Sequence, residues 1–239
     1  MRLGRNVKIY SWAKLIYPDN ISLGDETVID DFVFLYATGK GIEIGNFCHI
    51  TVNCCLMAGG LIKFGDFSAI GPGGVILAQT DDYHGNGFIG LKLFGGKYRN
   101  ITFGDVILGN HVHIGAGTII LPGVTIGDGC SVGAGSVITK DLPEWTICYG
   151  SPCRAMKKKP KEKQLEMEKE FLDEYKKSHY LREVVLVDTK IKQEEKDAGN
   201  KDESLDWDID PDALRLARSP LENFYREQRL NRPSGWRDR

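Results

Sequence analysis

The chain has 239 residues, which suits one domain with a small extension. A hydrophobic fraction of 41% and a charged fraction of 27% are typical of a folded globular protein. The formal net charge of −2 argues against a protein that neutralises nucleic-acid backbones. No apolar run approaches the ~20 residues of a membrane span. The first residues lack a continuous apolar stretch and a small-residue cleavage site, so we expect no secretory signal and a cytoplasmic location.

A six-residue period begins near residue 20. Branched aliphatic residues recur at every sixth position, and a small or β-branched residue follows four positions after each of them. The clearest block comprises Leu108, Ile114, Ile120, Ile126, Val132 and Ile138. A period of six fits neither a helix nor an ordinary strand, but it fits a short strand and a turn on each side of a triangular coil of about 18 residues. We therefore predict a mainly β solenoid around a continuous aliphatic column.

Three of the six cysteines occupy the small-residue position of this repeat: Cys48, Cys54 and Cys130. We expect them to be buried structural residues. The other three lie outside that position and are candidates for free thiols: Cys55, Cys148 and Cys153.

One long segment interrupts the repeat between Ile76 and Leu108, with an inserted loop at about 78–102. It is rich in glycine and contains the run QTDDYHGNG. Long excursions from a regular scaffold usually carry function, so we place the candidate chemistry here; a loop without a role is the alternative.

The repeat ends near residue 156. We therefore predict a β-solenoid domain over 1–156 and a small, mostly helical extension over 157–239. In the extension we expect a helix over 160–181, a strand over 183–188, a polar segment over 189–206, and two short helices that begin near residues 210 and 219.

Four consecutive runs from residue 114 onward, IGAGTI, ILPGVT, IGDGCS and VGAGSV, resemble the hexapeptide-repeat acyltransferases, and the resemblance covers roughly residues 20–155. It implies a left-handed parallel β-helix that transfers an acetyl group from acetyl-coenzyme A without a metal. It also implies a homotrimer with active sites between subunits. The inserted loop looks most like that of sugar O- and N-acetyltransferases of cell-surface polysaccharide biosynthesis.

Acyl transfer needs a group that takes a proton from the attacking hydroxyl or amine, and histidine is the usual base. The resemblance places this histidine in a loop just after the repeat Ile70–Pro72, which points to His84. Asp82 is predicted to orient its imidazole, with Asp81 as the alternative. A turn-capping role for these carboxylates stays open.

His111 is the second candidate base. It stands two residues before His113, so we expect both side chains to face outward. No third histidine follows at a zinc-ligand spacing, so we predict no metal site. The candidate substrate-binding residues are Asn53, Asp81, Tyr83 and His111. The loop residues Phe88, Phe94, Tyr98 and Arg99 either line an acceptor pocket or pack the loop.

The coenzyme A site is implied by the resemblance. Small residues of the last coils match the wall along which pantetheine lies: Gly115, Ala116, Gly133 and Ala134. Residues near the end of the repeat match positions beside the adenine and phosphates: Thr139, Lys140 and Arg154. The run 157–159 adds three lysines, which we expect more simply on a solvated helix face.

We therefore expect an acetyltransferase that acts on the amine of a nucleotide-linked deoxyamino sugar or on a sugar hydroxyl. One alternative is an antibiotic O-acetyltransferase for chloramphenicol or streptogramins. An alternative of another class is a non-catalytic β-helix used for assembly or binding. We expect no nucleic-acid partner.

Overall fold

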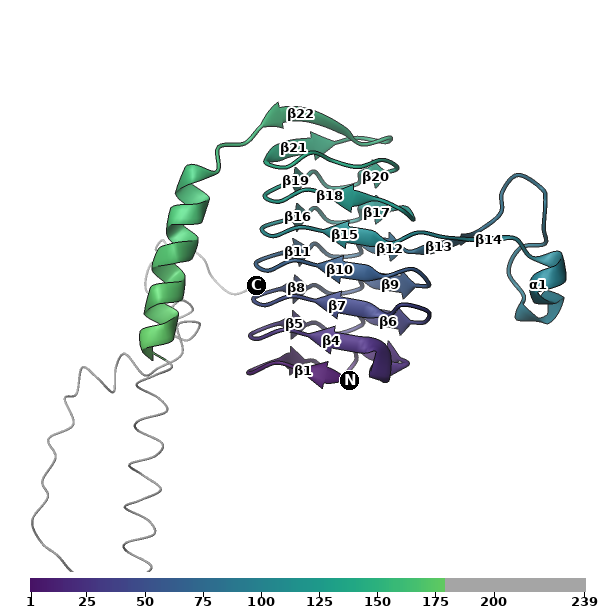
Figure 1. The fold of residues 1–239 in the computed structure, drawn as a ribbon, viewed down its shortest axis with the longest axis horizontal. Helices are drawn as coiled ribbons and strands as arrows, with labels where there is room; N and C mark the ends of the chain where they lie inside the picture. Colours follow the sequence, from purple (N-terminus) through teal and green to yellow (C-terminus); the bar gives the residue numbers. More distant parts are fainter. Residues whose placement is uncertain (179–239) are drawn as a thin grey trace, which may run out of the picture. The chain divides into compact units, whose positions relative to one another are not determined.

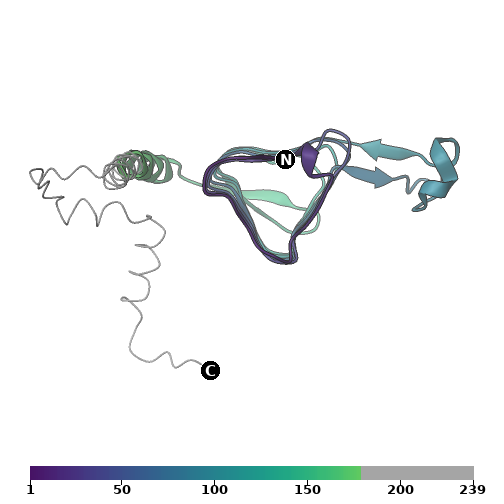
Figure 2. The ribbon, with the colours of Figure 1, turned by 90° about the horizontal axis from the view of Figure 1, so that it is seen from below.

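The structure is a computed structural model that describes residues 1–178. The chain divides into a unit over Met1–Lys161 and a second unit from Glu162 onward. The first unit is a triangular prism of stacked coils, and the predicted left-handed parallel β-helix is confirmed (Figure 1 and Figure 2). Within residues 1–178, no helix is long and apolar enough to cross a membrane.

Three parallel sheets form the sides of the prism. The first sheet contains β1 (Arg2–Leu3), β4 (Ile21–Leu23), β7 (Ile42–Ile44), β10 (Ile62–Phe64), β15 (Val106–Leu108) and β18 (Thr125–Ile126). The second contains β2 (Lys8–Ile9), β5 (Val28–Ile29), β8 (His49–Ile50), β11 (Ala69–Ile70), β16 (His113–Ile114), β19 (Ser131–Val132), β21 (Thr146–Tyr149) and the antiparallel β22 (Arg154–Lys158). The third contains β3 (Lys14–Ile16), β6 (Phe34–Ala37), β9 (Cys55–Ala58), β12 (Val75–Leu77), β17 (Ile119–Ile120) and β20 (Val137–Ile138).

Three short elements and one hairpin complete the described part. The 3₁₀ turns are η1 (Pro18–Asn20) and η2 (Lys92–Phe94), and α1 is Gly95–Tyr98. The strands β13 (Gln79–Asp81) and β14 (Ile101–Phe103) pair antiparallel outside the prism. In the second unit, residues 162–178 are helical.

The predicted six-residue repeat produces the core. In the third sheet, for example, Leu35 of β6, Leu56 of β9 and Ile76 of β12 point inward and are fully buried. The small-residue position is also buried, and Cys48, Cys54 and Cys130 occupy it as predicted. Burial raises the pKa of Cys48 and of Cys130 to about 12, so neither thiol is available as a nucleophile at neutral pH.

Two of the cysteines outside the small-residue position are also part of the core. Cys148 and Cys153 are buried at the carboxyl-terminal end of the prism, and the Cys130 and Cys148 Sγ atoms lie 3.6 Å apart. Cys55 is half-buried on the outer face of the third sheet. All six cysteines are free thiols.

The turn between the first and second sheets, here called the first corner, is held by a ladder of Asp and Asn side chains. The Asn46 side chain accepts the backbone N–H of Asp25, and Asp66 accepts that of Asn46, each within 2.8 Å. The preceding glycine is required because a Cβ at Gly45 would stand 2.5 Å from the Asp66 carboxylate. This explains the Gly–Asp/Asn pairs that recur along the sequence.

The second unit differs in detail from the prediction. The helix begins at residue 162, and the lysines at 157 and 158 belong to β22 rather than to a helix face. The predicted strand at 183–188, the polar segment and the two later helices lie outside the described residues. The boundary predicted at 156 falls inside β22, and the first unit ends at Lys161.

Candidate active site

The inserted segment forms an arm that leaves the prism at the turn between the third and first sheets, here called the third corner (Figure 1 and Figure 2). β13 and β14 are its two sides, with Asp81 opposite Ile101. The segment 82–100 closes its far end and includes η2 and α1. The arm therefore carries the QTDDYHGNG run away from the body of the coil.

Asp81 and Arg99 tie the two sides of the arm together. The Arg99 guanidinium donates to one Asp81 oxygen at 2.6 and 3.1 Å, and the Gly90 N–H donates to the other oxygen at 3.2 Å. Both side chains are more than four-fifths buried. Asp81, predicted to bind substrate, is therefore engaged in holding the loop.

Asp82 caps the turn that follows. One carboxylate oxygen accepts the backbone N–H of His84 at 2.8 Å, and the other accepts that of Asn86 at 2.9 Å. The side chain is buried, and these bonds, led by that from His84, lower the pKa of the Asp82 carboxyl. Asp82 therefore positions the main chain of the loop, which is the turn-capping alternative, and its oxygens are directed to amides rather than to an imidazole.

This turn presents His84 and Tyr83 to solvent. Both side chains are exposed, and Tyr83 reaches 79%. The main chain beneath them is fixed by Asp82 while the imidazole is free to meet a substrate. His84 thus keeps the placement that a general base needs, on a held loop with an accessible ring.

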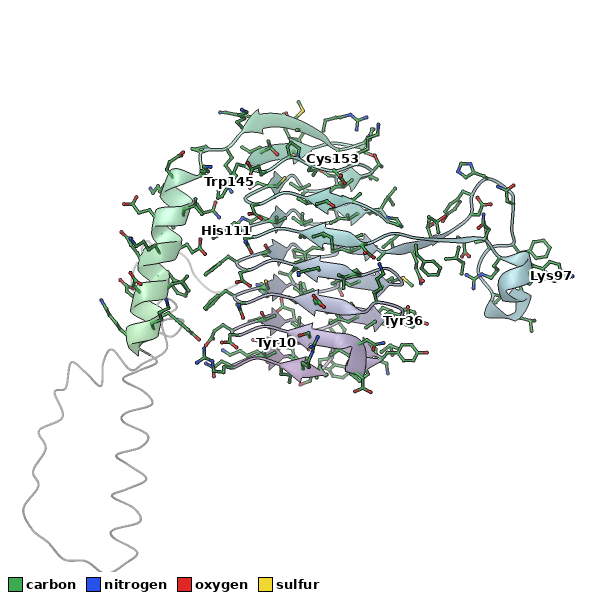
Figure 3. The ribbon with its side chains drawn as sticks, viewed as in Figure 1. Tyr10, Tyr36, Lys97, His111, Trp145 and Cys153 are labelled. Atoms are coloured by element: carbon green, nitrogen blue, oxygen red, sulfur yellow. The ribbon has the colours of Figure 1, made fainter. Side chains whose placement is uncertain are left out.

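His111 corrects the prediction of an outward-facing histidine. It occupies the first corner with φ 56°, is only 5% exposed and stacks on Phe67 with ring centroids 5.1 Å apart. Trp145 lies on its other side at 6.3 Å. His111 is buried because these rings of the neighbouring coils cover it, whereas His113 is exposed. Figure 3 shows His111 and Trp145 on the side of the prism opposite the arm that carries Lys97.

The aromatic residues of the arm pack mainly on one another. Phe88 contacts Phe94 and Tyr98, with centroids 5.0 and 6.2 Å apart. This is the loop-packing alternative for these residues. Arg99 also borders an open hollow of about 540 Å³ that runs along the arm, together with Gly95, Gly96, Asn100, Ile101 and Phe103.

The predicted coenzyme wall lies at the turn between the second and third sheets, here called the second corner. In each coil we compare the three residues that follow the strand of the second sheet, which the strand register aligns between coils. In successive coils the third of these residues is Trp12, Phe32, Asn53, Gly73, Gly117 and Gly135. Toward the carboxyl-terminal end this corner becomes an exposed ridge without large side chains, made of Ala116, Gly117, Ala134 and Gly135. A Cβ at Gly117 or Gly135 would meet no atom within 4 Å, so open space borders the ridge.

Gly115 and Gly133, predicted to line the coenzyme site, also lie against the next coil. A Cβ at Gly115 would stand 2.4 Å from the Ala134 backbone nitrogen, and one at Gly133 would stand 2.9 Å from the Tyr149 Cβ. Both glycines are needed for the stacking of coils. Gly117 and Gly135, which were not among the predicted residues, are the glycines of the IGAGTI and VGAGSV runs that face open space.

The predicted phosphate-binding residues divide between two corners. Arg154 is exposed and lies opposite Tyr149, above the ridge at the second corner. Thr139 and Lys140 are exposed after β20, where the chain turns toward the third corner. One chain alone therefore does not bring the three residues together.

Asn53 lies on the second corner below the ridge, exposed and with φ 61°. It shares this corner with the predicted coenzyme wall, in the coil just below the one from which the arm departs. His49 is exposed and pairs with Asp30 at 2.9 Å.

The outer face of the third sheet is apolar. Between the second and third corners it presents Phe34, Tyr36, Cys55, Met57, Val75, Leu77, Ile119 and Val137. The equivalent face of the first sheet is mixed, with Ser22, Glu43, Lys63, Ile107 and Thr125. Lys14 in the first coil is the exception on the third sheet. Contiguous apolar faces of this kind are common where proteins associate.

Among residues 1–178, no group of three His, Cys, Asp or Glu side chains gathers as metal ligands would. The arrangement instead offers an accessible histidine on the arm, an open ridge and exposed cations. These parts suit proton transfer and the binding of a long anionic ligand.

Comparison with known proteins identifies the family. The model of the bacterial transferase hexapeptide family, with six repeats, matches residues 105–140. The dTDP-4-amino-4,6-dideoxy-D-glucose acyltransferase of Escherichia coli is 35% identical over 169 residues, which are 71% of this chain and 87% of that protein. This chain belongs to the hexapeptide-repeat acyltransferases.

Two further relatives carry different activities in their names. AntD, an N-acyltransferase from Bacillus cereus, was solved with dTDP-4-amino-4,6-dideoxyglucose and coenzyme A; it is 38% identical, with a TM-score of 0.68 over 72% of this chain and 90% of that one. The galactoside O-acetyltransferase of Escherichia coli K12 is 30% identical over 57% of this chain and 63% of that protein.

Proposed function

We propose that this hexapeptide-repeat acyltransferase transfers an acetyl group from acetyl-coenzyme A to the amine of a nucleotide-linked deoxyamino sugar, in clefts between the subunits of a homotrimer. The observation that carries the proposal is the separation of the site's parts within one chain. The arm with His84 leaves the third corner, the ridge runs along the second corner, and the apolar outer face of the third sheet lies between them.

A threefold assembly brings these parts together. When three copies turn the third sheet toward a common axis, the second corner of each comes beside the third corner of its neighbour. Burial of the apolar face drives this arrangement. The arm of one subunit then reaches the ridge of the next, and Lys140 of one subunit approaches Arg154 of another.

The residues at the second corner fit coenzyme A. The ridge from Ala116 to Gly135 allows a long chain to lie against the backbone, since neither Gly117 nor Gly135 has a neighbour within 4 Å of a built Cβ. Arg154 and Lys140 supply cations for phosphate groups. When bound there, the coenzyme supplies the acetyl group as a reactive thioester.

His84 takes the proton that the acceptor loses. In the proposed site its ring nitrogen accepts this proton as the acceptor nitrogen bonds to the acetyl carbonyl carbon and the sulfur leaves. Asp82 holds the main chain of His84 through the 2.8 Å amide bond, and the Asp81–Arg99 pair holds the base of the loop. Asp82 and Asp81 are thus positioning residues.

The amine of a nucleotide-linked sugar is favoured as acceptor because the Escherichia coli relative is named for such a substrate and AntD was solved in complex with one. The galactoside relative, which matches a smaller share, supports a sugar hydroxyl as the second candidate.

The test is release of free thiol from acetyl-coenzyme A with a panel of acceptors: a dTDP-linked 4-amino-4,6-dideoxyhexose, galactosides and chloramphenicol. Release with the nucleotide-linked amine alone is the expected result. Release only with galactosides would move the acceptor to a hydroxyl. Release only with chloramphenicol, or none from a protein that does not bind acetyl-coenzyme A, would refute the proposal.

A further inference from the structure

Two aromatic side chains stand exposed on the second corner, below the ridge. Trp12 is 69% exposed and Phe32 is 59% exposed. Their rings stack with centroids 6.1 Å apart and planes inclined by 25°. They come from the first two coils and occupy the corner position that holds Gly117 and Gly135 farther along.

The two turns that carry these rings are fixed by hydrogen bonding and by backbone conformation. The Asp31 carboxylate accepts the Trp12 backbone N–H at 2.9 Å, and Phe32 is fixed in the left-handed region at φ 60°. The neighbouring Asp30 is paired with His49 at 2.9 Å. Both acids beside the rings are therefore already engaged, and the rings themselves are presented to solvent on a rigid corner.

We propose that this pair is the platform on which the base of a pyrimidine nucleoside diphosphate sugar stacks when the sugar is acetylated. The inference rests on the proposed function. The proposed function places the coenzyme along the ridge and the reacting groups in the coil from which the arm departs. The acceptor must then extend from the arm toward the amino-terminal coils along the same corner.

The spacing suits this class of acceptor. The arm departs after β12 in the fourth coil, and Phe32 follows β5 in the second, so two coil spacings, roughly 10 Å, separate the two levels. A free monosaccharide at the arm does not span this distance. A sugar carried on a nucleoside diphosphate does, and its base reaches the rings, with the exposed Asn53 in the coil between.

The pair also has the chemistry for a base. Nucleobases stack on exposed aromatic rings whatever their sequence context, and removal of such a ring weakens binding by about 5- to 100-fold. The rings lie against each other and offer their outer surfaces, so they provide a flat apolar support rather than a closed pocket.

The experiment compares wild-type protein with Phe32→Leu and Phe32→Tyr. Leucine keeps apolar bulk but removes the ring face, whereas tyrosine keeps the ring. Calorimetric titration with thymidine diphosphate measures the platform directly, without acyl transfer. KM for the nucleotide-linked amine and for acetyl-coenzyme A, together with the assembly size from light scattering, are measured for each protein.

We expect Phe32→Leu to weaken thymidine diphosphate binding about 5- to 100-fold and to raise the acceptor KM similarly. The acetyl-coenzyme A KM and the assembly size should not change, and Phe32→Tyr should resemble wild type. Equal affinity of wild type and Phe32→Leu, no binding to wild type, or a smaller assembly of Phe32→Leu would overturn the proposal; the last result would make the pair a subunit contact. Ring-dependent binding without any acyl transfer would uphold the platform while the proposed function failed.

Discussion

The carboxylate of Asp82 lies 2.8 Å from the backbone nitrogen of His84, two residues along the chain, and binds it together with the amide of Asn86. The carboxylate nearest in sequence to the candidate base thus acts on the main chain of His84. The loop is ordered by a charge-assisted cap, which makes its order dependent on pH.

The first prediction concerns this cap. The amide bonds lower the Asp82 pKa in the folded protein, so the ionised form stabilises the loop. This contribution is full above the unfolded Asp pKa of about 3.9 and is lost as the pH falls through the lower folded value. In an NMR titration the His84 and Asn86 amide shifts should change together, with a midpoint below ~3.9. A midpoint at or above the ordinary value would show that the cap does not form.

The second prediction concerns the base. His84→Ala should lower turnover about 10²- to 10⁴-fold, the usual contribution of general-base catalysis. Because the side chain is exposed, the melting temperature and the affinity for acetyl-coenzyme A should stay at wild-type values. His49→Ala, which removes another exposed histidine, is the control and should remain fully active. Wild-type turnover of the His84 variant would exclude this residue as the base.

The third prediction distinguishes residues of the ridge that contact the coenzyme from residues that the coils need for stacking. Ala134→Trp should block acetyl-coenzyme A binding while the prism stays folded, because Ala134 is exposed on the open ridge. Gly115→Val should instead destabilise the fold by about 1–3 kcal/mol or more, since even its Cβ meets the next coil at 2.4 Å. Thermal melting and coenzyme titration of both variants distinguish the roles. Wild-type affinity in Ala134→Trp would mean that the groove is elsewhere.

The fourth prediction concerns the apolar face. Ile119→Lys on the third sheet should break the assembly into monomers and abolish activity, because it buries a charge at the proposed interface. Ile107→Lys is matched to it in residue type and partial exposure but lies on the first sheet, where the assembly should tolerate it. Light scattering measures the assembly size of both variants. If only the Ile107 variant dissociated, the subunit interface would lie on the first sheet rather than on the third.

The sequence predicted the coil well because each inward position depends on a local, periodic choice. The aliphatic column and the buried Cys48, Cys54 and Cys130 follow from spacing alone. The burial of His111 was missed because the rings that cover it, Phe67 and Trp145, come from neighbouring coils, and nothing in the run LGNHVHIG signals these contacts.

The site was harder to predict than the fold. The Asp81–Arg99 pair joins residues 18 positions apart across an irregular loop, and no period relates them. The roles of Gly115 and Gly117 differ although both stand in one hexapeptide, because only the register of the next coil decides which glycine is covered. That register becomes visible only in three dimensions.

The central claim is that each active site combines the arm of one subunit with the ridge of another, and subunit mixing tests it most directly. His84→Ala and Ala134→Trp chains, each inactive alone, are unfolded together, refolded at equal amounts and assayed. If the site is shared, random trimers contain about one quarter of clefts with an intact arm and an intact ridge, and activity returns to about a quarter of wild type. If each chain carries its own complete site, every chain keeps one defect, and the mixture stays inactive.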